Sequence, residues 1–357
     1  MWKLIYSYIF IFSLFASLVL VSAFRRLAIR WQVVDLPQAQ RKIHTQSTPL
    51  LGGAAMYAAF TLTIGLNLLL IYFFFAKGML PEYITVYLAG IKLITLQLSA
   101  ILGTTFVLVL MGIYDDIKGL GAKTKLGIEI ILASIVFFSG IKISLFIHNP
   151  FICWLITVLW IVGISNAFNL LDNMDGLSSG IALISSIIFF LVAVSGHHFF
   201  VATILACFSG VMLGFLWFNF PPAKVFMGDA GSLFIGYTLS LLTIINTYYT
   251  HSAPTIAPVI MPLLIMAVPI FDTLSVIRIR LKNKVSIFQA DKNHLSHRLM
   301  QRGMSVKQTL FFIYLLSFAI GLGGLLLTAL NAQGCYLVLI QAICIILIIA
   351  ILEGNKQ

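Results

Sequence analysis

Apolar residues occur along this chain in stretches of about 20 residues, separated by shorter polar segments. A helix of about 20 apolar residues crosses the hydrocarbon core of a bilayer, so each stretch predicts a transmembrane helix. The first stretch is too long for the apolar region of a signal peptide and lacks a clear small-residue cleavage site, so we interpret it as a span. Eleven spans are predicted, over about 4–24, 50–75, 93–113, 126–146, 151–168, 178–195, 199–219, 230–249, 255–277, 309–330 and 333–352. The pattern predicts an all-α polytopic membrane protein, folded as a single bundle over residues 1–357.

Composition agrees with the membrane assignment. Hydrophobic residues make up 61% of the chain and charged residues 9%, against about 45–50% and about 25% in soluble domains. A soluble fold would have too few polar side chains to cover its surface. The four cysteines lie in or beside apolar stretches without a CxxC spacing, which argues against a disulfide or a zinc site.

The basic residues are distributed unevenly between the two sides of the predicted bundle. Of the 22 Lys and Arg residues, 18 lie in loops that follow odd-numbered spans or in the C-terminal tail. By the positive-inside rule that side is cytoplasmic, with the N-terminus outside and the C-terminus inside. The net charge of +11 is therefore a topology signal, and no nucleic-acid partner is expected. The predicted cytoplasmic loops are 25–49, 114–125, 166–178, 220–229 and 278–308, and we expect them to form the active site.

The aspartates share this bias, although the positive-inside rule gives acidic residues little weight. All eight lie at or near the predicted cytoplasmic side: Asp35, Asp115, Asp116, Asp172, Asp175, Asp229, Asp272 and Asp291. Carboxylates beside hydrocarbon are costly unless a positive group offsets them. Their clustering indicates a chemical cause, and a hard cation such as Mg²⁺ prefers oxygen ligands of this kind.

Two polar motifs carry most of these acids. Asp115 and Asp116 follow the third span, where a solvated helix end is the alternative to a metal or phosphate site. Asn166, Asn169, Asp172 and Asp175 recur every three residues, which would align them on one face of a helix or of a 3₁₀-like segment. The alternative for this second motif is a polar turn between two spans.

A third motif runs from Asn219 to Ser232 and contains Asp229 at the start of the eighth span. The free N–H groups of a helix N-terminus favour phosphate, although Asp229 could serve only as the cap of this helix. The long basic loop ends in His294, His297 and Arg298, which suit a diphosphate; attraction to anionic lipid is the simpler alternative. A weaker motif, with Lys42 and His44, precedes Gly52-Gly53 at the second span.

In this order and at these span junctions, the motifs resemble the polyprenyl-phosphate N-acetylhexosamine-1-phosphate transferases, most closely the bacterial undecaprenyl-phosphate N-acetylglucosamine-1-phosphate transferases. The most specific segments are Asp115-Asp116, 166–177, 225–232 and 294–298. The resemblance covers nearly the whole chain, including eleven spans with the N-terminus outside. One departure is Ser296, which stands where many relatives have a denser histidine cluster, and it affects the expected sugar selectivity more than the reaction.

The resemblance implies a role for each candidate residue. It implies Mg²⁺, or alternatively Mn²⁺, held at Asn169 and Asp229, and catalytic roles for Asp115, Asp116, Asp172 and Asp175. It implies substrate-binding roles for Lys42, His44, Lys125, Asn166, Asn219, His294, His297 and Arg298. The implied partners are a UDP-N-acetylhexosamine donor, an undecaprenyl phosphate acceptor and the bilayer of the bacterial inner membrane, with a homodimer left open.

The residues by themselves also fit this chemistry. Both substrates are anionic, and in phosphoryl transfer positioning and charge neutralisation do most of the work. We expect direct attack of the lipid phosphate on the β-phosphorus of the donor, with a covalent intermediate at Asp115 or Asp116 as the rival route. Two other functions stay open: transfer of phospho-N-acetylmuramoyl-pentapeptide, and, in a different class, secondary transport. A transporter would place its ionisable residues near the midplane between inverted repeats, and the chain shows no such repeat.

Overall fold

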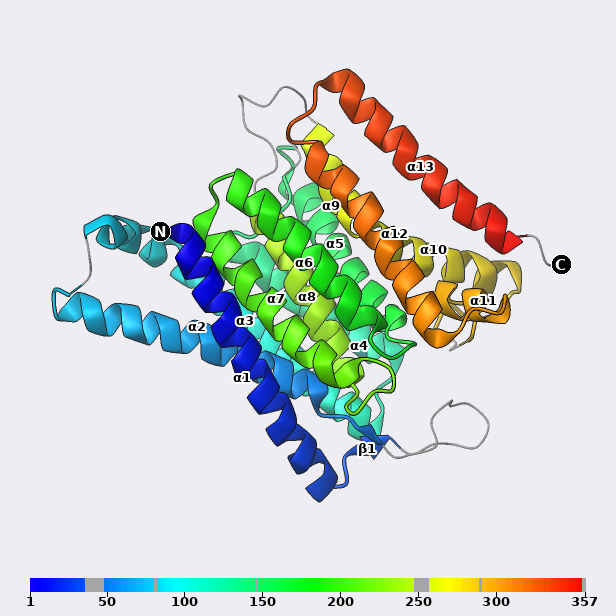
Figure 1. The fold of residues 1–357 in the computed structure, drawn as a ribbon, viewed down its shortest axis with the longest axis horizontal. Coiled ribbons are helices and arrows are strands. Elements are labelled where there is room, and N and C mark those ends of the chain that lie inside the picture. The colour runs from blue at the N-terminus through cyan, green and yellow to red at the C-terminus, as the bar shows by residue number, and fades with distance from the viewer. Residues whose placement is uncertain (36–47, 80–81, 145–146, 247–256, 289–290, 355–357) are drawn as a thin grey trace.

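The computed structural model describes residues 1–35, 48–79, 82–144, 147–246, 257–288 and 291–354, and they form a helical bundle (Figure 1). Two short strands pair antiparallel near the N-terminus: β1 (Val34–Asp35) and β2 (Thr48–Pro49). The α-helices are α1 (Trp2–Arg30), α2 (Gly52–Ala76), α3 (Glu82–Lys118), α4 (Ala122–Phe138), α5 (Pro150–Leu171), α6 (Leu177–Ser195), α7 (Phe199–Asn219), α8 (Gly228–Ile245), α9 (Met261–Ile265), α10 (Ala267–Lys282), α11 (Leu295–Gln301), α12 (Val306–Leu326) and α13 (Ala332–Gly354).

Nine of the helices in the described part of the chain are long and apolar enough to cross a membrane: α1, α2, α3, α5, α6, α7, α8, α12 and α13. The predicted class of polytopic helical membrane protein is therefore confirmed. The two other predicted spans differ in form. The segment expected at 126–146 is the 17-residue helix α4, and the one expected at 255–277 consists of a 3₁₀ turn (Ala257–Ile260), α9 and α10.

Local backbone signals explain why these two segments are not single long helices. Helix α4 ends at Phe138, well before the predicted end, and Gly140 follows with φ +96. Glycine adopts this left-handed conformation without a steric penalty and commonly terminates helices. Between α9 and α10, Met266 leaves the helical conformation at φ −100 and ψ 21. Hydropathy alone did not distinguish these breaks from continuous spans.

Helix α8 lies at the centre of the bundle and α13 at its edge (Figure 1). In the most apolar part of α8, 78% is buried, whereas in the more apolar α13 only 22% is buried. A helix enclosed by protein does not need a lipid-compatible surface, so α8 can carry polar and small residues. This central position brings the start of α8 within reach of several other helices.

Glycines allow α2 and α3 to pack directly against the start of α8. A Cβ atom at Gly53 of α2 would lie 2.2 Å from the backbone nitrogen of Gly231, and one at Gly112 of α3 would lie 2.3 Å from the Cα atom of Ala230. Small residues at such contacts let helix backbones approach closely in membrane proteins. The same contacts fix Asp115 and Asp116, which follow Gly112 on α3, beside the start of α8.

The connections at this end of the bundle are tied to one another by hydrogen bonds. Phe226, in the loop between α7 and α8, donates its backbone N–H to the Pro49 carbonyl at 2.8 Å. The backbone N–H of Ala223, in the same loop, donates to Asp175 at 2.9 Å, and Asp175 lies in the turn between α5 and α6. Residues far apart in the sequence therefore meet at one end of the molecule.

Candidate active site

Lys125 joins two of the predicted carboxylates. It lies in the first turn of α4, and its Nζ is 2.7 Å from Asp115 Oδ2 and 2.7 Å from Asp229 Oδ2. The other oxygen of Asp115 accepts the backbone N–H of Leu120. All three charged side chains are partly exposed, so the cluster is accessible from outside the protein. One lysine therefore bridges carboxylates that come from α3 and α8.

Asp116 caps the start of α8. Its two carboxylate oxygens accept the backbone N–H groups of Asp229 at 2.8 Å and of Ala230 at 3.4 Å. Gly228 precedes them with φ +64, and a Cβ atom there would lie 2.3 Å from the Asp116 carboxylate. Only glycine accommodates both this backbone conformation and this close approach. A role for Asp229 only as the cap of this helix was the alternative prediction, but in the structure Asp116 from another helix caps α8.

The motif with a spacing of three does not lie on one continuous helix. Asn166 and Asn169 lie in the last turns of α5, whereas Asp172 is its C-terminal cap and Asp175 lies in the following turn. The Asn166 amide donates to Glu129 of α4, and the Asn169 amide donates to Ser232 of α8 at 2.9 Å. The helical part of the prediction therefore holds for the first two residues only.

Four of the predicted site aspartates, Asp116, Asp172, Asp175 and Asp229, are close enough for their charges to interact. Burial raises the pKa of Asp172 well above its ordinary value, and the charges of Asp229, Asp116 and Asp175 raise it further. Carboxylates that share a site disfavour one another's ionisation, and a nearby cation reverses that effect. The repulsion at Asp172 indicates that this cluster would be stabilised by a bound positive ion.

Asn219 is predicted to bind substrate, but its amide is used within the protein. It is buried, and its Oδ1 accepts the Gly176 backbone N–H and the Ser179 hydroxyl, each at 3.0 Å. Its Nδ2 donates to the Val225 carbonyl at 3.0 Å. These contacts favour a role in fixing the two loops that carry Asp175 and Asp229 over direct contact with substrate.

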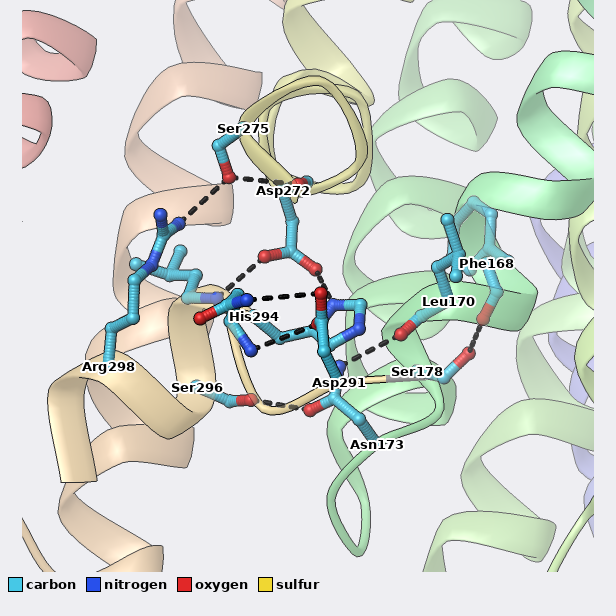
Figure 2. Close-up of polar contacts among 12 residues, drawn as sticks. Phe168, Leu170, Asn173, Ser178, Asp272, Ser275, Asp291, His294, Ser296 and Arg298 are labelled. Atoms are coloured by element: carbon cyan, nitrogen blue, oxygen red, sulfur yellow. Dashed lines mark hydrogen bonds and ion pairs between the residues drawn. The ribbon is translucent and has the colours of Figure 1, made fainter. Parts of the chain in front are cut away.

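The basic loop lies against α10 and the turn between α5 and α6 (Figure 2). His294 Nδ1 is 2.8 Å from the Asp272 carboxylate, and both side chains are buried. Ser296 donates its hydroxyl to the Asn173 side chain, next to Asp172. The loop is therefore anchored at two points, one on α10 and one on the turn that carries the predicted acids.

The other two predicted residues of this loop, His297 and Arg298, lie on α11. Arg298 Nη2 donates to the Ser275 hydroxyl of α10 at 2.8 Å (Figure 2). The His297 ring is 6.4 Å from that of His294, measured between centroids. Burial lowers the pKa of His297, and the charges of His294 and Lys292 lower it further. A neutral imidazole can accept or donate a hydrogen bond, whereas Arg298 can only donate. Lys42 and His44 lie outside the described residues.

Two further residues take part in this arrangement: Glu129, which the sequence did not single out, and Asp272, which was counted among the clustered aspartates without being given a role. Glu129 is buried in α4 and accepts the Asn166 amide. Asp272 is buried in α10 and holds His294. Each falls within a predicted span, where an ionisable residue is by default a functional candidate. That signal could have identified both.

The oxygen atoms near Asn169 suit a magnesium ion. Because Asn169 Nδ2 donates to Ser232, its Oδ1 is left as the acceptor, and Asp229 lies in the first turn of the same helix α8. In the described ranges, no three His, Cys, Asp or Glu side chains are grouped closely enough to hold a metal without other ligands. Mg²⁺ commonly binds one or two protein oxygens, several waters and substrate phosphates. The donor set therefore fits a metal completed by substrate.

Comparison with known proteins places the chain in a family. Residues 98–247 match the model of glycosyl transferase family 4. A Bacillus subtilis (strain 168) protein named "probable undecaprenyl-phosphate N-acetylglucosaminyl 1-phosphate transferase" is 34% identical over 327 residues, covering 89% of this chain and 84% of that protein. The chain belongs to the polyprenyl-phosphate N-acetylhexosamine-1-phosphate transferases. The predicted family is therefore confirmed.

Two further relatives show how far the similarity of this transferase extends. The decaprenyl-phosphate N-acetylglucosaminephosphotransferase of Mycobacterium leprae (strain TN) is 31% identical over 347 residues, covering 89% of this chain and 83% of that protein. A phospho-N-acetylmuramoyl-pentapeptide-transferase of Streptococcus pyogenes serotype M12 (strain MGAS2096) is 37% identical over 164 residues, covering 41% and 49%. This match to a pentapeptide enzyme covers less than half of each chain.

Proposed function

We propose that this membrane transferase moves N-acetylglucosamine-1-phosphate from UDP-N-acetylglucosamine to undecaprenyl phosphate and releases UMP. The observation that carries the proposal is the meeting of Asp115, Lys125 and Asp229 from three helices, beside Asp172. Similarity over most of the chain to transferases named for N-acetylglucosamine supports this sugar over the muramoyl-pentapeptide. The same similarity favours an enzyme over a secondary transporter.

The proposed site lies on the cytoplasmic side of a bundle of eleven spans, in which α4 and the α9–α10 segment supply the two shorter crossings. Lys125 lies at the start of α4 and contacts the end of α3, and Asn169 lies at the end of α5. Both observations fit α4 leading away from the site and α5 returning to it. The excess of Lys and Arg in the loops on this side supports the cytoplasmic orientation.

In the proposed reaction an oxygen of the lipid phosphate attacks the β-phosphorus of the UDP-sugar. The bond from that phosphorus to the bridging oxygen breaks, and the electron pair leaves with UMP. A phosphate monoester has a second pKa of about 6, so the acceptor is largely ionised at neutral pH without a strong base. The role of the protein is then to bring two anions together and to offset their repulsion.

Each group of residues has a place in this reaction. Mg²⁺, when bound at Asn169 and Asp229, would offset the charge of the donor diphosphate. Lys125 lies between Asp115 and Asp229, where its ammonium group can contact a phosphate oxygen. Arg298 and His294 on the basic loop can donate hydrogen bonds to the donor from the other side.

The hydrogen bonds of the aspartate pair favour direct attack over a covalent intermediate. Both oxygens of Asp115 accept hydrogen bonds, from Leu120 and Lys125, and both oxygens of Asp116 accept backbone N–H groups of α8. A carboxylate oxygen whose lone pairs are engaged by donors is a weaker nucleophile. Trapping of radiolabelled sugar phosphate on either aspartate during turnover would contradict direct attack.

Asp229→Ala tests the metal assignment. The purified variant is assayed with UDP-N-acetylglucosamine, undecaprenyl phosphate and Mg²⁺. Loss of a residue that only orients a metal ligand typically lowers activity about 10–100-fold. We expect UMP release by Asp229→Ala to fall further than that. Wild-type protein should lose the same activity in EDTA and regain it with Mg²⁺ or Mn²⁺. Near wild-type UMP release by a folded Asp229→Ala variant would show that the metal is held elsewhere.

A further inference from the structure

Asp272 is a buried carboxylate that the proposed reaction does not yet use. It lies on α10 and is 1% exposed. Its Oδ2 is 2.8 Å from His294 Nδ1, and its Oδ1 accepts the backbone N–H of Leu295 at 2.6 Å (Figure 2). A buried carboxylate is costly unless hydrogen bonds and charges compensate for its lost hydration. Both compensating contacts come from the start of α11: from His294, which precedes the helix, and from Leu295, its first residue.

The contact with Asp272 requires a proton on Nδ1 of His294. A carboxylate oxygen is an acceptor, so the ring nitrogen facing it, Nδ1, must be the donor. The second nitrogen, Nε2, is then the ring atom that can contact a substrate. In histidines that act on a substrate or metal, a hydrogen bond at one nitrogen commonly fixes the tautomer and orientation in this way.

The loop that carries His294 is also tied to the acidic turn. Ser296 donates its hydroxyl to Asn173, which lies between the predicted catalytic residues Asp172 and Asp175. Arg298 bonds to Ser275, and the Ser275 hydroxyl donates to the backbone carbonyl of Asp272 at 2.9 Å. The Asp272 carboxylate therefore places His294, whereas Arg298 is tied to the same turn of α10 through Ser275 and the Asp272 backbone carbonyl.

We propose that Asp272 is a positioning residue for sugar-phosphate transfer: it holds His294 by Nδ1, so that Nε2 donates a hydrogen bond to the diphosphate of the sugar nucleotide. The proposal rests on the proposed function. Asp272 itself touches no substrate, and no bond is made or broken at it. The carboxylate balances the positive charge that His294 carries when both ring nitrogens are protonated beside the diphosphate.

Kinetics of single and double variants test whether Asp272 acts through His294. We expect Asp272→Asn to lower kcat about 10-fold or more, as orienting residues do, and Asp272→Glu to restore part of the loss. Residues that act as a unit are not additive. Asp272→Asn should therefore change activity and its pH dependence much less in a His294→Gln background. If Asp272→Asn lowers kcat by the same factor in the wild-type protein and in the His294→Gln variant, the proposal is contradicted.

A second measurement does not depend on activity. Deuterium exchange at the imidazole C2–H of each histidine can be followed by mass spectrometry of the full-length protein. We expect the rate at His294 to change several-fold in Asp272→Asn and to stay unchanged in Asp291→Asn. Asp291 is the matched control, because it is a loop carboxylate that bonds to Arg280 at 2.9 Å rather than to a histidine. An unchanged rate at His294 in Asp272→Asn would overturn the positioning role.

The two measurements separate failure of this inference from failure of the proposed function. Wild-type protein that releases no UMP from any UDP-sugar would contradict the proposed function, and with it a role for Asp272 in transfer. Active wild-type protein in which Asp272→Asn leaves both His294 exchange and kcat unchanged would contradict the inference about Asp272 alone.

Discussion

At the scale of single residues, the site depends on charges that are each balanced by a partner from another helix. Lys125 balances Asp115 and Asp229, and Asp272 accepts hydrogen bonds from His294 and Leu295. Removing one member of a buried or partly buried charge pair leaves the other uncompensated, which costs more than the pair contributes. Such residues are therefore expected to affect function more strongly than exposed charges of the same type.

Two lysines on the first turn of α4 make this expectation testable. Lys125→Ala should lower UMP release by about 10-fold or more, the order expected for loss of a charged contact to phosphate. Lys123→Ala is the matched control, because Lys123 is exposed on the same turn and should leave activity near wild type. Equal losses in the two variants would mean that Lys125 contributes only through the general charge of this surface.

His297 is expected to make the stability of the fold sensitive to acid. Burial, with the charges of His294 and Lys292, lowers its pKa, while Asp272 and Asp291 oppose that shift. The unfolded chain therefore binds a proton before the folded protein does, and the free energy of unfolding falls as pH drops below about 6.5. Between pH 7.5 and 5.5, the apparent Tm of His297→Gln should fall by less than that of the wild-type protein. His148→Gln, at an exposed position, should behave as wild type does.

At the scale of secondary-structure elements, the site is assembled at helix ends. The C-terminal ends of α3 and α5 meet the N-terminal ends of α4 and α8, so each contributes polar residues without interrupting an apolar span. Close contact between α3 and α8 requires a residue without a side chain at Gly112. Packing at this point and the position of Asp116 are therefore linked.

Two glycines of α3 separate this packing effect from helix propensity. Gly112→Ala should lower the free energy of unfolding by about 1–3 kcal/mol, as overpacking does, and should also lower kcat because Asp116 moves relative to Asp229. Gly103→Ala is the control, because a Cβ atom there meets no atom within 4 Å. It should be neutral or stabilise the helix by up to about 1 kcal/mol. Thermal unfolding and UMP release are measured on both variants. Equal effects of Gly112→Ala and Gly103→Ala would show that the close contact between α3 and α8 does not matter.

At the scale of the whole molecule, we expect the loops of the proposed site to share the cytoplasmic side of the membrane. We expect a cysteine at Lys123 to be shielded from a membrane-impermeant maleimide in intact cells and labelled after permeabilisation. A cysteine at Lys77, on the opposite side of the predicted topology, should be labelled in both conditions. The native cysteines are first replaced, since Cys344 is exposed. The reverse pattern of labelling would show that the proposed orientation is wrong.

The sequence alone determined that the chain is a polytopic helical membrane protein, because the length and composition of its apolar stretches leave no other way to satisfy the backbone. Its ordered motifs, which include Asp115 and Asp229, also identified the family, and the resemblance to that family implied a role for Lys125. The apolar spans are local features of the sequence, and the family depends on the order of the motifs along the chain, so both can be recognised from the sequence directly.

Tertiary structure decided which helices supply each contact. The capping of α8 by Asp116, the holding of His294 by Asp272 and the hydrogen bond from Gly176 to Asn219 each join residues at least 22 positions apart. No spacing rule links such pairs, because helix packing brings them together. The break at Met266 and the early end of α4 likewise depend on backbone conformation, which hydropathy does not encode.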